Sequence, residues 1–160
     1  MNKDILVAIL EDDLFSRNWM ALLLVRDWRT RVIGEFASQA GLFSYLNRSD
    51  LKFDVLVLNV DPIVEHFSID EICQTLSRFR HPSKVLLTGI KADQKVVRQI
   101  KEECANVRGY VLKGEAGYSL SWVITFIDEG YWVMTPGTCD LFAKMPHNPL
   151  ILEGRQTLPG

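Results

Sequence analysis

The sequence predicts an α/β fold, with a five-stranded parallel sheet and about five helices. Two observations predict it. Five short apolar runs recur along the chain, and each is followed by a segment of helical length. Several of these runs are nearly continuous in Val, Ile and Leu, which is typical of strands buried on both faces of a parallel sheet. Strict alternation of strand and helix places helices on both faces of such a sheet.

The expected strands are the five apolar runs, at residues 5–10, 31–36, 54–58, 84–88 and 109–112. The second run is more mixed than the others and is expected nearer an edge of the sheet. Right-handed crossovers restrict the possible topologies strongly. For a chain of this size they favour the doubly wound, flavodoxin-like order, whose functional crevice lies at the carboxyl ends of the strands.

The expected helices lie between the strands, at residues 15–27, 38–47, 68–79, 93–104 and 116–129. In the first of them Trp19, Leu22, Leu23 and Arg26 recur at spacings of three and four, which is typical of a helix. Gly130 follows the last helix, where a glycine commonly ends a helix.

Length and composition fit one globular domain. The chain has 160 residues, 48% of them hydrophobic, and a formal net charge of −2. Because this net charge is negative, we do not expect the segment to bind the nucleic-acid backbone by itself. No stretch approaches the roughly 20 apolar residues of a membrane span, and no signal peptide is recognisable, so we expect a cytoplasmic protein with no membrane contact. The spacing of the three cysteines predicts neither a disulfide framework nor a zinc site.

The last segment of the chain contains several prolines and glycines and shows little periodicity. We therefore expect one domain at residues 1–135 and a tail or linker at 136–160. Such a linker could lead to a further domain that this chain does not contain.

Polar side chains follow four of the expected strands, where parallel strands would bring them to one crevice. They are Glu11, Asp12 and Asp13 after the first strand, Asn59 and Asp61 after the third, Thr88 at the fourth and Lys113 after the fifth. Clustered carboxylates repel one another and need a cation or a raised pKa. Mg²⁺ with oxygen ligands would meet that need, and a lysine beside a hydroxyl would form an anion-binding corner.

These residues in this order resemble the signature positions of bacterial response-regulator receiver domains, the CheY-like fold. The motifs are Glu11-Asp12, Arg17, the run ending at Asn59, Leu86-Leu-Thr-Gly89 and Gly109-Tyr-Val-Leu-Lys113-Gly114. The stretch from Lys113 through Glu129-Gly-Tyr131 resembles the LuxR/NarL-type subgroup, which carries a helix-turn-helix domain. The resemblance covers about residues 3 to 135.

The resemblance assigns a role to each pocket residue. Glu11 and Asp12 would be the metal-binding acidic pair, with Asp13 as an alternate. Thr88 would be the switch hydroxyl that contacts the phosphoryl group, and Tyr110 the switch aromatic. Lys113 would pair with the phosphoryl group.

The main departure is Asn59, which stands where the family has its phospho-accepting aspartate. A carboxylate can attack phosphorus, whereas a carboxamide nitrogen is a poor nucleophile. Loss of this charge also weakens the expected Mg²⁺ site. Asp61 is a poor substitute acceptor, because Pro62 ends the strand beside it. The loop after Asn59 is altered as well, which favours a natural departure over a single introduced substitution.

The last expected helix carries a second stripe of aromatic residues, Tyr118, Trp122 and Phe126. Two interpretations remain open. The stripe packs against the tail or a neighbouring loop, or it forms a homodimer or partner surface, because helices seldom leave three large aromatics in water. In the resembling family this helix, the fifth strand and the preceding helix commonly form the dimer face.

The sequence therefore predicts a phosphorylation-independent receiver of a two-component-type response regulator. It would act in signal transduction, as a dimerisation or regulatory module of a transcriptional regulator. We expect no enzymatic activity, no cofactor beyond weakly bound Mg²⁺, and DNA contact only through a domain outside this chain. The alternatives are a stand-alone protein–protein adaptor and a small metal-dependent phosphatase-like enzyme.

Overall fold

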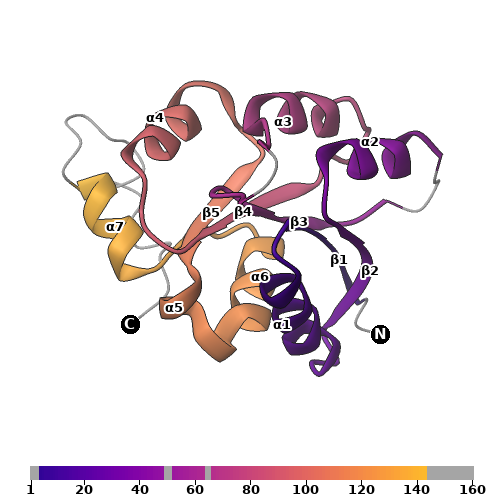
Figure 1. Ribbon diagram of the computed structural model, residues 1–160, viewed down its shortest axis with the longest axis horizontal. Helices are drawn as coiled ribbons and strands as arrows, with labels where there is room; N and C mark the ends of the chain where they lie inside the picture. Colours follow the sequence, from indigo (N-terminus) through magenta and orange to yellow (C-terminus); the bar gives the residue numbers. More distant parts are fainter. Residues whose placement is uncertain (1–3, 49–51, 64–65, 144–160) are drawn as a thin grey trace.

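A computed structural model describes residues 4–48, 52–63 and 66–143. Its centre is one parallel sheet in the order β2-β1-β3-β4-β5-β6. Figure 1 labels the first five of these strands. The strands are β1 (Ile5–Leu10), β2 (Thr30–Phe36), β3 (Val55–Asn59), β4 (Lys84–Gly89), β5 (Val107–Leu112) and β6 (Val133–Met134). This is the doubly wound α/β order that the alternating pattern predicted, with one short strand added at the β5 edge.

Helices cover both faces of the sheet, and each face has its own apolar core. One layer holds α2 (Gln39–Arg48), α3 (Ile69–Ser77), α4 (Gln94–Glu103) and α7 (Pro136–Ala143). The other layer holds α1 (Leu14–Val25) and α6 (Leu120–Asp128), which lie side by side in Figure 1. Among the described residues, no helix combines the length and hydropathy needed to cross a lipid bilayer.

The predicted last helix is divided in the structure. It begins with the short α5 (Lys113–Ala116), continues as the 3₁₀ turn η1 (Gly117–Ser119), and becomes α6 only at Leu120. Gly117 has φ of 48°, a conformation that L side chains rarely adopt, and this breaks the regular helix. The break leaves Tyr118 in the turn while Trp122 and Phe126 lie on α6.

The segment after residue 132 holds more structure than the sequence predicted. We expected a tail or linker from residue 136, but 136–143 form α7, whose Phe142 is fully buried. Pro136 suits the first position of a helix, because that residue needs no hydrogen-bond donor. The expected tail beyond this helix, at residues 144–160, lies outside the described residues.

Candidate functional site

Glu11, Asn59 and Lys113 meet at the carboxyl ends of β1, β3 and β5. The Nδ2 amide of Asn59 donates a hydrogen bond to Oε2 of Glu11 at 2.7 Å. The Lys113 ammonium forms an ion pair and hydrogen bond with Oε1 of the same carboxylate. These residues are 48 and 102 positions apart from Glu11 in the chain, and parallel strand packing alone brings them together.

The Glu11 carboxylate is fully buried, and its surroundings act on its charge in opposite directions. Burial raises the pKa of Glu11, while the hydrogen bond and charge of Lys113 oppose that rise. A backbone bond from the Asp13 amide to Oε2, at 3.2 Å, gives the carboxylate a further donor. The buried carboxylate is therefore compensated from within the protein by one cation and two neutral donors.

The two acidic residues after Glu11, Asp12 and Asp13, make different contacts. Asp13 caps α1, because its Oδ2 accepts a hydrogen bond from the Ser16 amide at 2.9 Å, and this bond lowers the pKa of Asp13. Asp12 is half-buried and lies at the edge of the cluster, with its Oδ1 3.5 Å from Nδ2 of Asn59. Of the three expected acids, Glu11 therefore forms the centre of the corner.

The residues present do not fit a Mg²⁺ ion. Both oxygens of Glu11 already accept hydrogen bonds, and the Lys113 ammonium holds the position beside Oε1. Asn59 turns its amide nitrogen toward the acids, and a nitrogen donor is not an Mg²⁺ ligand. In the part of the chain that the structure describes, no group of three His, Cys, Asp or Glu residues could hold a metal ion.

The two expected switch residues lie on the neighbouring strands and are both buried. Thr88 is directly opposite Asn59 in the β3–β4 register. The Tyr110 hydroxyl accepts a hydrogen bond from the Asp93 amide at 3.0 Å and donates to the Lys91 carbonyl at 3.4 Å. Burial raises the pKa of Tyr110. Tyr110 therefore points inward and ties β5 to the loop that leads into α4.

Asp61 has a structural part in the same corner. Its Oδ2 accepts a hydrogen bond from the Ile90 amide at 2.9 Å, and its own amide donates to Oδ1 of Asn59 at 3.3 Å. The Asp61 carboxylate thus braces the loop after β4 through the Ile90 amide.

The expected aromatic stripe is partly packed and partly exposed. Trp122 and Phe126 are neighbours at a ring separation of 6.3 Å, and Tyr131 meets Phe126 edge-on at 5.8 Å. Tyr118 is 86% exposed. The neighbouring turn supplies Arg29, whose guanidinium lies 3.8 Å from the Trp122 ring centre.

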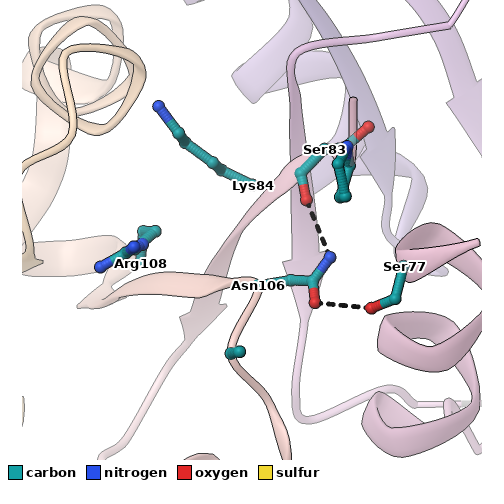
Figure 2. Close-up of a pocket in the computed structure, with 7 residues that line it drawn as sticks. Ser77, Ser83, Lys84, Asn106 and Arg108 are labelled. Carbon is teal, nitrogen blue, oxygen red and sulfur yellow. Dashed lines mark hydrogen bonds between the residues drawn. The ribbon is translucent and has the colours of Figure 1, made fainter. Parts of the chain in front are cut away.

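A hollow of about 400 Å³ lies at the opposite end of the sheet, near the start of β4 and β5 (Figure 2). Several of its polar side chains are engaged in internal hydrogen bonds. Asn106 accepts a hydrogen bond from the Ser77 hydroxyl at 2.9 Å and donates to the Ser83 carbonyl at 3.3 Å. Lys84 donates to the Asp128 carbonyl at 2.8 Å. None of the residues that the sequence singled out lines this hollow.

Comparison with known proteins shows the fold. No protein-family model and no curated protein sequence matches the chain. The isolated receiver domain of RcsB from Salmonella enterica serovar Typhimurium, with phosphomimetic BeF₃⁻, is similar with a TM-score of 0.71 and 16% identity, over 87% of this chain and 99% of that one. A LuxR-family two-component response regulator from Aurantimonas gives a TM-score of 0.73 and 18% identity, over 89% and 97%.

A third similar structure is that of two RcsB dimers bound to two parallel DNAs, with a TM-score of 0.73 and 16% identity, over 96% of this chain and 77% of that one. The chain therefore has the fold of response-regulator receiver domains, including that of a LuxR-family member, as the resemblance predicted.

Proposed function

We propose that this chain is a receiver module of a LuxR-type regulator that works without phosphorylation. One observation carries the proposal: the side chain at the acceptor position, Asn59, donates a hydrogen bond to a fully buried Glu11 that Lys113 already neutralises. A carboxamide is a poor nucleophile, and this one is committed to holding its neighbour. Phosphorylation normally biases a two-state equilibrium, and here the polar corner is occupied by internal contacts.

The position of Tyr110 supports a fixed state of the switch. Its ring is buried and its hydroxyl holds the loop before α4 through Lys91 and Asp93. The output would then depend on association with a second copy or another protein, in the cytoplasm, with DNA contact left to a separate domain. RcsB, which shares the fold, is seen as dimers bound to DNA. The proposed role needs no catalysis and no resident cofactor.

Incubation with acetyl phosphate and Mg²⁺, followed by intact mass measurement, tests the proposal. We expect no adduct, because Asn59 offers no nucleophilic oxygen. A stable gain of about 80 Da, the mass of one phosphoryl group on a carboxylate, would contradict it. A receiver domain with an intact aspartate, treated in the same tube, controls for the reagent.

A protein–protein adaptor is a second candidate, and the exposed aromatic side chains Tyr118 and Trp122 favour it. Binding of a partner that is unaffected by substitution of Tyr110 or Thr88 would support an adaptor over a receiver-type regulator. A partner whose affinity changes with Tyr110 would support the receiver-type regulator.

A further inference from the structure

The hollow at the start of β4 and β5 lies at the opposite end of the sheet from the Glu11 corner (Figure 2). We call it the basal hollow. Its volume of about 400 Å³ is within the range of sites that hold small organic molecules. Its lining comes from the end of α3, from the segments that lead into β4 and β5, and from the first residues of those strands.

The charges at the basal hollow are positive. Lys84 of β4 and Arg108 of β5 both line it and are half-buried, and no acidic residue is among the described residues of its lining. The chain beside it, at residues 77–84, adds the exposed Arg78 and Arg80 and contains no acid. The basal hollow is therefore a basic site in a chain whose formal net charge is −2.

A shift in strand register accompanies Arg108 at this position. Val85 of β4 is opposite Val107, whereas the next residue, Leu86, is opposite Gly109. Arg108 is thus the extra residue on β5, which is the arrangement of a β-bulge. Bulges change the direction of a side chain and are common beside functional sites. The irregularity of β5 therefore coincides with the one arginine of the lining.

The two sides of the basal hollow differ in their hydrogen bonding. On one side the Ser77 hydroxyl donates to Asn106 at 2.9 Å. On the other side lie Lys84 and Arg108, as Figure 2 shows. The Lys84 ammonium has three donors and gives one to the Asp128 carbonyl at 2.8 Å. The Arg108 guanidinium makes no hydrogen bond or ion pair with any other residue that the structure describes.

The chemistry of this lining fits a doubly charged anion with an organic group. A guanidinium presents a fork of donors that matches the oxygens of a phosphate, and an ammonium adds a second positive charge. A phosphate monoester carries about −1.5 to −2 charges at neutral pH, which two cations on neighbouring strands would balance. Pro82 and Ala105 supply apolar surface in the same lining, where the organic group of an ester would lie.

We propose that the basal hollow is a binding site for a small phosphate monoester, held by Lys84 and Arg108 with its organic group against Pro82 and Ala105. This inference goes beyond the proposed function and does not depend on it. It involves binding alone, with no transfer of a phosphoryl group, and it concerns the end of the sheet away from Asn59.

The test is a nuclear magnetic resonance titration of the whole isotope-labelled chain with phenyl phosphate at neutral pH. We expect saturable shifts at the main-chain amides of Ala105, Asn106 and Arg108, and none at those of Asn59 and Lys113. Phenyl sulfate has the same ring but a single negative charge, so it should bind about tenfold or more weakly. Inorganic phosphate lacks the ring and should also bind more weakly than the ester.

Two matched variants locate the binding energy. Arg108→Gln and Arg31→Gln each remove one arginine charge, and Arg31 is exposed on β2 at the far edge of the sheet. Arg108→Gln should weaken phenyl phosphate binding about tenfold or more, whereas Arg31→Gln should leave it within about twofold. Lys84→Gln should act like Arg108→Gln. Circular dichroism confirms that each variant folds.

Three results would overturn the proposal: no saturable shift at the basal hollow, shifts confined to the Asn59 and Lys113 corner, or equal weakening by Arg108→Gln and Arg31→Gln. Equal affinity for phenyl sulfate or for inorganic phosphate would overturn the assignment to a phosphate monoester. A phosphoryl adduct with acetyl phosphate would remove the proposed function and leave this titration unaffected. The two failures are therefore distinguishable.

Discussion

Two ion pairs occupy different environments in this molecule. Glu11 and Lys113 form the pair inside the strand-end corner, where the side chains are 0% and 14% exposed. Asp27 and Arg29 form the other, 17% and 18% exposed, in the turn between α1 and β2. The inner pair joins residues 102 positions apart, and the outer pair joins residues two positions apart.

The difference teaches what each pair does for the protein. Without Lys113, the buried Glu11 would keep a charge that water cannot reach, so loss of Lys113 alone should destabilise the fold strongly. The outer pair stays near solvent and is replaceable in stability terms. Its effect is to orient Arg29 over Trp122, which shapes a surface. One pair thus joins distant strands at the polar corner, and the other orients a side chain at the surface.

Removal of the inner cation should have the largest effect. Lys113→Ala leaves Glu11 buried and unpaired, and we expect a loss of about 3–5 kcal/mol in the free energy of unfolding. Urea denaturation measures it. In the double variant Glu11→Gln with Lys113→Met no buried charge remains, and most of the stability should return. A loss below about 1 kcal/mol for Lys113→Ala would mean that the inner pair behaves like a surface pair.

A second carboxylate in the corner should have an intermediate effect. Asn59→Asp removes the donor to Glu11 and adds a like charge beside it, so we expect a loss of about 1–3 kcal/mol. Because two acids then face each other, MgCl₂ should raise the thermal midpoint of this variant. The wild-type midpoint should not respond to MgCl₂ beyond a NaCl control of equal ionic strength. A specific Mg²⁺ response of the wild type would show that Lys113 leaves the corner.

Removal of the outer cation should have the smallest effect. Arg29→Ala should cost about 0–1 kcal/mol, from a partly exposed ion pair and a cation–π contact. The pair also predicts a pH dependence. Arg29 lowers the pKa of Asp27, so the pair stabilises the fold above the unfolded pKa of about 3.9 and loses that contribution as the pH falls further. Acid titration of unfolding should therefore be steeper for the wild type than for Arg29→Ala.

The sequence by itself determined the fold class and the strand order. Nearly continuous apolar runs leave few alternatives to buried parallel strands, and right-handed crossovers then settle the topology. It also determined which residues stand at the carboxyl ends of the strands, since register follows from where each apolar run stops. Glu11, Asn59, Thr88 and Lys113 could be selected in this way before any coordinates.

Only the tertiary structure decided which of those residues pair with one another and which side of α1 is exposed to solvent. Whether Lys113 pairs with Glu11 or waits for a ligand depends on atomic distances that no local pattern encodes. The position of α7 depends on a long-range contact, the burial of Phe142 against the core that contains β5 and α4. In α1 the apolar residues Met20, Ala21 and Leu24 are buried whereas Phe15, Leu22 and Val25 are exposed, and the periodicity of one helix cannot tell which apolar side meets the sheet.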